Sequence, residues 1–156
     1  MLTLRSPAFA DGGEIPARYT CEGEDVSPSL EIGGVPNGAK SLVLVVHDPD
    51  APDPASPRID WVHWILYNLP PSTQRLAEGV SALPPGTGVG MTDFKRTGWG
   101  GPCPPIGRHR YLFELTALDT VLPDLGTPVR KELERAMAGH TLAKAKCTGT
   151  YQKQTR

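Results

Sequence analysis

The pattern of apolar and polar positions along the chain predicts three long strands. Residues 41–47 hold five consecutive aliphatic side chains, three of them β-branched, which is typical of a strand buried on both faces. We expect this strand to end at residue 48, because the prolines that follow cannot donate to a sheet ladder. Residues 61–68 and 111–118 are the other two apolar runs. The core should therefore be built on a central pair of buried strands.

Residues 61–68 also indicate which side chains share a face of their strand. Successive side chains of a strand point to opposite faces, so regular alternation divides this segment into two sets. The first set is Trp61, His63, Ile65 and Tyr67, and the second is Val62, Trp64 and Leu66.

Shorter elements are expected on either side of these strands. Short edge strands suit residues 1–20, another short strand suits 29–32, and Val80 and Leu83 are candidates for one more within the irregular segment 69–100. One helix is predicted from Pro128 to about Ala138, with Thr127 as N-cap and Gly139 as its stop. Its apolar stripe is Val129, Leu133, Ala136 and Met137. Residues 142–146 fit either a second helical turn or a strand, and 147–152 read as the last strand.

Composition agrees with a strand-rich chain. Glycine and proline, 17 of each, supply 34 of the 156 residues, which suits many short elements joined by shaped loops. The sequence therefore predicts a mainly β protein, an antiparallel Greek-key sandwich with one or two short C-terminal helices. Its length is that of a single domain spanning residues 1–156.

Charge and cysteine content restrict the partners. A net charge of −1 argues against nonspecific nucleic-acid binding. No apolar run approaches the roughly 18 residues needed to span a bilayer, and the N-terminus lacks the apolar stretch of a signal peptide. Three cysteines cannot all pair within one chain, and so sparse a number fits a reducing cytoplasm. We expect a cytoplasmic protein without integral membrane association.

The loop at residues 98–111 is the strongest candidate for a binding site. It is rich in glycine and proline, which together give a loop a defined shape, and it ends in His109 and Tyr111. Imidazoles can donate hydrogen bonds to a phosphate, more strongly when protonated, and the backbone N–H groups of residues 101–103 can form an anion-binding nest. A small anion is the predicted ligand.

Other polar residues stand at the ends of the predicted strands. Asp48 and Asp50 follow the first strand and His63 lies in the second, so they could meet His109 at one end of a sandwich. Each also has an ordinary structural explanation. His63 could be a hydrogen-bonded core histidine, Asp48 a backbone-capping turn residue, and Asp50 and Asp53 solvated turn acids. Beside a phosphate, Asp48 would hold a histidine oriented and protonated, or would accept a hydrogen bond from an amine or hydroxyl of the ligand.

Two enzymatic alternatives use the same residues. His47, Asp48, Asp50, His63 and His109 could assemble a metal site, although no recognised metal-ligand spacing supports one. Cys103 beside His109 could form a Cys–His nucleophile. A hydrolase or metal-dependent enzyme is therefore the alternative to a binding protein without cofactor or metal.

Three stretches together resemble the phosphatidylethanolamine-binding protein family, and within it the bacterial and archaeal Raf kinase inhibitor-like branch. They are Asp48-Pro49-Asp50-Ala51-Pro52, Trp61-Val62-His63-Trp64, and Gly101-Pro102-Cys103-Pro104-Pro105 with His109-Arg110-Tyr111. Shorter matching stretches cover nearly the whole chain in order. The resemblance implies a Greek-key sandwich with a small pocket at one end that binds phosphate-bearing anions such as the phosphoethanolamine head group.

Carried over residue by residue, the resemblance implies a specific ligand set. The pocket would use Asp48, Pro52, Trp61, His63, Cys103 (through its backbone N–H), Pro104, His109 and Tyr111. It also implies a cis peptide at Ala51-Pro52. The sequence departs from the family pattern at His47, Ile32 and Thr92 and in the short spacer 106–108, which changes the rim of the pocket.

The resemblance further implies a non-enzymatic protein that could regulate a protein partner such as a kinase. A hydrophobic edge could pair two copies into a homodimer, although no apolar stripe requires one.

Overall fold

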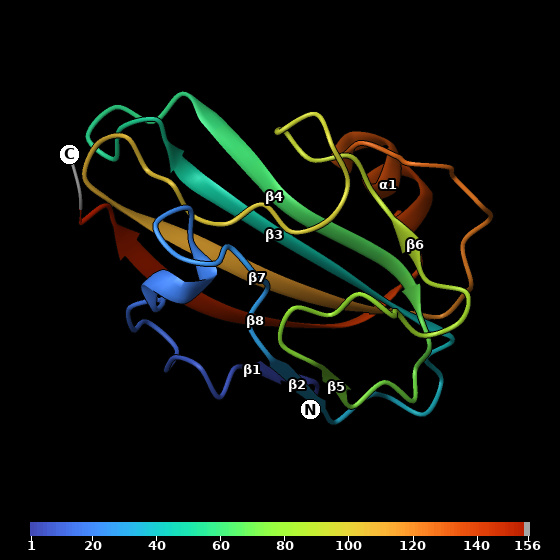
Figure 1. Ribbon diagram of the computed structural model, residues 1–156. Coiled ribbons are helices and arrows are strands. Elements are labelled where there is room, and N and C mark those ends of the chain that lie inside the picture. Colours follow the sequence, from blue (N-terminus) through green and yellow to red (C-terminus); the bar gives the residue numbers. More distant parts are fainter. Residues whose placement is uncertain (155–156) are drawn as a thin grey trace.

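The computed structural model describes residues 1–154 as two antiparallel sheets and one α-helix, which confirms the mainly β prediction (Figure 1). The strands of the larger sheet, in spatial order, are β6 (Gly88–Val89), β4 (Ile59–Leu69), β3 (Ser41–Ala51), β7 (Arg108–Leu118) and β8 (Thr141–Gln152). The smaller sheet contains β1 (Thr3–Arg5), β2 (Leu30–Gly33) and β5 (Arg75–Leu76). A 3₁₀ turn, η1 (Ala17–Tyr19), and the helix α1 (Arg130–Met137) complete the described elements.

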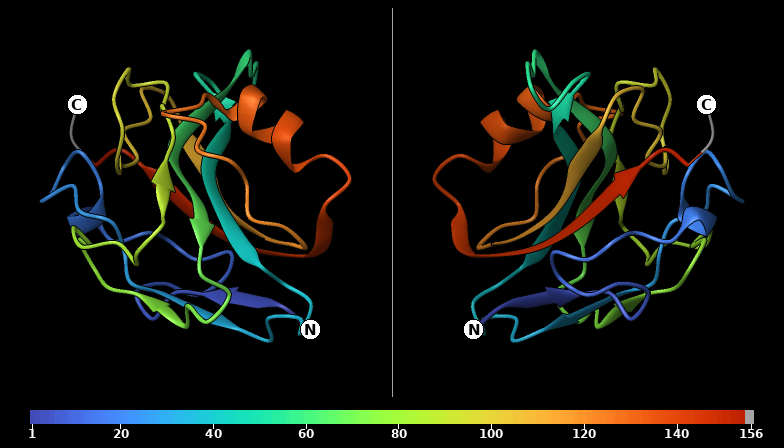
Figure 2. Two further views of the ribbon diagram at one scale, coloured as in Figure 1. Left: turned by 90° about the vertical axis from the view of Figure 1, so that its right-hand side faces the viewer. Right: turned by 90° about the vertical axis from the view of Figure 1, so that its left-hand side faces the viewer.

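The larger sheet is covered on both faces, which explains why β3 is apolar throughout. Its inner face packs against the smaller sheet, with side chains such as Leu44, Trp64 and Phe113 in the main core. Its outer face packs against α1, whose Leu133 is fully buried beside Val45 and Ile65. Figure 2 shows the helix and the smaller sheet on opposite sides of the long strands. The predicted central pair of buried strands is confirmed as β3 and β4, which are neighbours in the sheet, and β7 lies on the other side of β3.

Two predictions for the shorter elements are wrong, and one open alternative is decided. Val80 and Leu83 belong to no strand and pack against the core from a loop. Residues 142–146 are part of β8 rather than a helical turn, because β8 pairs with β7 from the Leu118–Thr141 pair onward. The N-cap of α1 is Val129 instead of Thr127, and the carboxylate of Glu132 accepts a hydrogen bond of 3.1 Å from the Val129 N–H. Gly139, with φ +82°, follows the end of the helix as predicted.

The strand β3 also runs further than its sequence predicts. It continues through Asp48, Pro49 and Asp50 to Ala51, and a bulge in the β3–β4 register between Asp48 and Ala51 absorbs the proline. Pairing resumes beyond it, where the Ala51 carbonyl accepts a hydrogen bond from the Arg58 N–H. The peptide bond between Ala51 and Pro52 is cis, as the family resemblance implied.

Across residues 1–154, none of the helices has the length and apolar character that crossing a membrane requires.

Candidate functional site

A cavity of about 290 Å³ lies where β3 ends and β4 and β7 begin, next to the loop that leads into β7. All eight residues proposed from the sequence line it. They are Asp48, Pro52, Trp61, His63, Cys103, Pro104, His109 and Tyr111. Four further residues complete the lining, namely Ala51, Ile59, Phe94 and Pro105. The structure thus brings together side chains from four separate stretches of the chain.

A bulge in β4 turns His63 toward this cavity. Val46 and His47 are neighbours on β3, yet their partners on β4 are Trp64 and Val62, so His63 is the extra residue. The predicted division of β4 into two faces is therefore wrong beyond this point. Val62 packs with Ile65 and Tyr67 under α1, whereas Trp61 and His63 line the cavity on the opposite face.

The polar floor of the cavity includes a buried pair formed by Asp48 and His109. Asp48 Oδ2 lies 2.5 Å from His109 Nδ1, and His109 Nε2–H donates to the Ile106 carbonyl at 2.8 Å. Asp48 Oδ1 accepts a hydrogen bond of 2.7 Å from the Asp50 N–H. Burial raises the pKa of Asp48, and the hydrogen bond with His109 opposes that effect. Asp48 therefore caps the backbone and orients a histidine, which are two of the roles that the sequence left open.

His63 is held as a neutral ring. Only 3% of the residue is exposed, and burial lowers its pKa to about 4. Its Nδ1–H donates to the Gly100 carbonyl at 2.6 Å. A neutral imidazole with its proton on Nδ1 has a lone pair on Nε2. The sequence assigned both imidazoles as hydrogen-bond donors to an anion, whereas the structure shows the N–H groups of both rings engaged within the protein.

Tyr111 has a buried hydroxyl without a hydrogen-bond partner. Its side chain is 1% exposed, and its OH makes no hydrogen bond to any residue that the structure describes. Burial, with Asp48 and Asp50 nearby, raises the pKa of Tyr111, so the phenol keeps its proton. The ring lies between the two histidines, edge-on to His63 at 5.2 Å and stacked near His109 at 6.4 Å. A buried hydroxyl without a partner in the lining of a cavity requires an acceptor, such as a water molecule or a ligand atom.

Asp50 does not behave as the solvated turn acid that its surroundings in the sequence suggested. Only 7% of the residue is exposed, and its two carboxylate oxygens accept hydrogen bonds from Arg110 Nε at 3.0 Å and Nη2 at 2.9 Å. These bonds from Arg110 lower the pKa of Asp50. Asp50 is not part of the cavity lining. Its role is to fix the end of β3 to β7.

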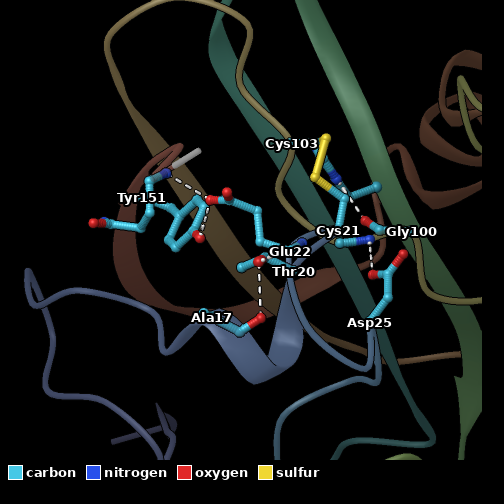
Figure 3. The surroundings of a disulfide bond; sticks show 11 residues. Ala17, Thr20, Cys21, Glu22, Asp25, Gly100, Cys103 and Tyr151 are labelled. Atoms are coloured by element: carbon cyan, nitrogen blue, oxygen red, sulfur yellow. Dashed lines mark hydrogen bonds between the residues drawn. A yellow bond between two sulfur atoms is a disulfide. The ribbon is translucent and has the colours of Figure 1, made fainter. Parts of the chain in front are cut away.

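The loop before β7 is attached to residues 19–25 by a disulfide bond between Cys21 and Cys103 (Figure 3). Three hydrogen bonds join the same two segments: Cys21 N–H to the Pro102 carbonyl, Gly101 N–H to Asp25 Oδ1, and Trp99 Nε1–H to the Tyr19 carbonyl. The sequence suggested a backbone N–H role or a Cys–His nucleophile for Cys103, and neither anticipated that its sulfur crosslinks the loop. A Cys–His nucleophile is not available while that bond is intact.

The metal alternative is not supported by the positions of its residues. His47 lies outside the cavity lining, where its Nδ1 is 2.7 Å from Asp60 Oδ1 and its Nε2 contacts Glu114. Between residues 1 and 154, there is no group of three or more His, Cys, Asp or Glu side chains that could hold a metal ion.

Phe94 is the lining residue that sequence reasoning missed and that contacts other site residues. Its ring lies edge-on to Trp61 at 5.5 Å and to His63 at 5.2 Å. It comes from the irregular segment 69–100, where no periodicity assigns a face to a side chain. Ile59 and Ala51 were missed because the strands that carry them run further than predicted.

Sequence comparison gives one family. The sequence model of a family described as "Phosphatidylethanolamine-binding protein" matches residues 5–152. A UPF0098 protein of Methanothermobacter thermautotrophicus is 47% identical, and the alignment covers 97% of this chain and 99% of the relative.

Solved structures agree with that match. A phosphatidylethanolamine-binding protein homolog from Chlamydia trachomatis superposes with a TM-score of 0.91 at 42% identity, covering 98% of both chains. The structure of E. coli YbcL, described as a new member of the mammalian PEBP family, gives a TM-score of 0.87 at 30% identity. That alignment covers 98% of this chain and 99% of YbcL.

Proposed function

Because this chain belongs to the phosphatidylethanolamine-binding protein family, we propose that its cavity binds a small anion of the phosphate type. The observation that carries the proposal is the Tyr111 hydroxyl, which is buried at the cavity without a partner. A buried donor of this kind costs free energy unless something accepts its hydrogen bond, and an oxyanion supplies a strong acceptor.

The shape of the cavity supports a small ligand with a polar end. At about 290 Å³ it lies at the lower end of the volume of small-molecule sites. The polar floor is Asp48, His63, His109 and Tyr111, whereas the surrounding walls are mostly proline and aromatic side chains. An anionic group would sit at the floor, with a short organic substituent against the walls.

The experiment compares wild-type protein with Tyr111→Phe during titration with phosphate and with phosphoethanolamine. The ring resonances of His63 and Tyr111 are followed by NMR, and the affinity is measured by calorimetry. A hydrogen bond to a charged group contributes about 1.5–3 kcal/mol, so we expect the variant to bind about 10- to 100-fold more weakly.

Tyr19→Phe is the matched control, because the Tyr19 hydroxyl donates to Glu78 Oε1 at 2.6 Å and lies outside the cavity lining. It should bind as the wild type does. Unchanged ring resonances in wild-type protein at millimolar ligand, or equal affinities for Tyr111→Phe and wild type, would refute an anion site that uses Tyr111.

Regulation of a protein partner such as a kinase, a homodimer, and a hydrolase that uses the same cavity stay predictions. A cytoplasmic location stays a prediction too, and the Cys21–Cys103 disulfide does not add to it, because such bonds persist mainly in oxidising compartments.

A further inference from the structure

The hydrogen-bonding groups at the floor of the cavity can be assigned as donors or acceptors. Both ring nitrogens of His109 face oxygen atoms, one on the Ile106 carbonyl and one on Asp48. The carbonyl can only accept, so Nε2 carries a proton, and a second proton must lie between Nδ1 and Asp48 Oδ2. Whichever atom holds that second proton, the Asp48–His109 pair has no net charge. Both protons of the pair are engaged in hydrogen bonds within the protein.

His63 offers an acceptor. The Gly100 carbonyl bonded to Nδ1 can only accept, so Nδ1 carries the proton of the neutral ring and Nε2 carries none. Nε2 has no hydrogen-bond donor among the residues that the structure describes, and the ring lines the cavity. The floor therefore presents one free side-chain donor, the Tyr111 hydroxyl, and one free ring acceptor, His63 Nε2.

Protonation of His63 would convert this acceptor into a donor, and its surroundings oppose that change. The titratable side chains around it are Asp48 and His47 on β3, His109 and Tyr111 on β7, and Asp93 in the loop after β6. Burial and the two neighbouring histidines lower the pKa of His63 to about 4, and only the Gly100 carbonyl acts in the other direction. At neutral pH the ring is an acceptor.

We propose that the cavity selects oxyacid monoanions that retain one acidic O–H, such as the monoanion of a phosphate monoester, over oxyanions that have none. The ligand O–H donates to His63 Nε2, and an ionised oxygen of the same group accepts from the Tyr111 hydroxyl. This inference rests on the proposed function and adds the protonation state that the site accepts. A site with a buried acceptor discriminates strongly against an analogue without the matching donor, because the acceptor would remain unpaired.

Methyl phosphate and methyl sulfate test the inference directly. At pH 5 both are monoanions of similar size, but only methyl phosphate carries an O–H. We expect wild-type protein to bind methyl phosphate at least tenfold more tightly than methyl sulfate. The second ionisation of a phosphate monoester has a pKa of about 6, so the apparent dissociation constant should rise about tenfold per pH unit above it. Dimethyl phosphate, also a monoanion without an O–H, should behave like methyl sulfate.

A second measurement in wild-type protein avoids any variant that could misfold. The ¹⁵N shifts of the His63 ring should show Nδ1 protonated and Nε2 unprotonated, both before and after methyl phosphate is added. In His63→Phe, which keeps an aromatic ring but has no acceptor, the preference for methyl phosphate over methyl sulfate should disappear.

The outcomes separate this inference from the proposed function. Equal binding of methyl phosphate and methyl sulfate, or ¹⁵N shifts of a doubly protonated His63 ring in the complex, would overturn the selectivity and leave the anion site intact. Binding of neither probe at millimolar concentration would overturn both.

Discussion

Removal of the Cys21–Cys103 disulfide should destabilise the protein mainly through its unfolded chain. The two cysteines are 82 residues apart in sequence. For a closed loop of that length the chain-entropy relation gives about 15 cal/mol/K, or about 4.5 kcal/mol at 25 °C. Disulfides commonly contribute less than this value, so we expect Cys21→Ser/Cys103→Ser to lower the free energy of unfolding by about 2–4.5 kcal/mol.

The folded loop should change little in this variant, because three hydrogen bonds still join its residues to segment 19–25. Urea denaturation followed by tryptophan fluorescence measures the effect. With a slope of about 2 kcal/mol per M, the midpoint should fall by about 1–2 M. Wild-type protein treated with dithiothreitol should move to the midpoint of the double variant, and the variant itself should not respond to the reductant.

Thiol counting is the control for this experiment. Denatured, unreduced wild-type protein should contain one reactive thiol, that of Cys147, and three after reduction. If the oxidised wild type and the double variant unfold at the same urea concentration, the bond does not restrict the unfolded chain and the reasoning fails.

Two further predictions concern the core and the pH dependence of stability. Leu133→Ala should lower the free energy of unfolding in urea by about 2–5 kcal/mol, because Leu133 is fully buried between α1 and the sheet. Val129→Ala should lower it far less, because Val129 is 45% exposed. Equal losses of stability in the two variants would contradict the packing of α1. The pKa of His63 is about 4 in the folded protein, whereas the ordinary value is 6.5. Between these pH values the unfolded chain binds more protons than the folded protein does. The free energy of unfolding should therefore fall by roughly 2–4 kcal/mol as the pH drops from about 6.5 to 4. Denaturation across this pH range should show that slope in wild type and a smaller one in His63→Phe; equal slopes would mean that His63 is not buried as a neutral ring.

Sequence patterns predict an element well when its side chains share one environment, such as full burial in the core. The aliphatic run of β3 is buried on both faces and was identified for that reason. The sequence predicts β8 without an alternative only from residue 147, because the first half of this edge strand is largely solvated and residues such as Leu142 are exposed. Hydrophobic periodicity carries little information where a strand is largely solvated.

The cavity residues could be predicted, but their chemistry could not. All eight line one cavity because the family motifs preserve their order and spacing. The proton positions on His63 and His109 depend on the Gly100 and Ile106 carbonyls, which the sequence does not place. The pairing of Asp50 with Arg110 and of Cys21 with Cys103 likewise depends on contacts 60 and 82 residues apart.

Because of the bulge at His63, the residues of β4 that face the helix have even numbers before the bulge and odd numbers after it. From Ile65 onward, odd-numbered positions such as Ile65 and Tyr67 support the helix, whereas before the bulge the even-numbered Val62 does so. Deletion of His63 would restore strict alternation and leave Trp61 and Val62 on their present faces, but the cavity would lose its histidine. An insertion or deletion elsewhere in β4 would move the residues on one side of it to the opposite face of the sheet. This part of the gene should therefore tolerate many substitutions more readily than a one-codon insertion or deletion, since the site depends on residue count as well as on residue type.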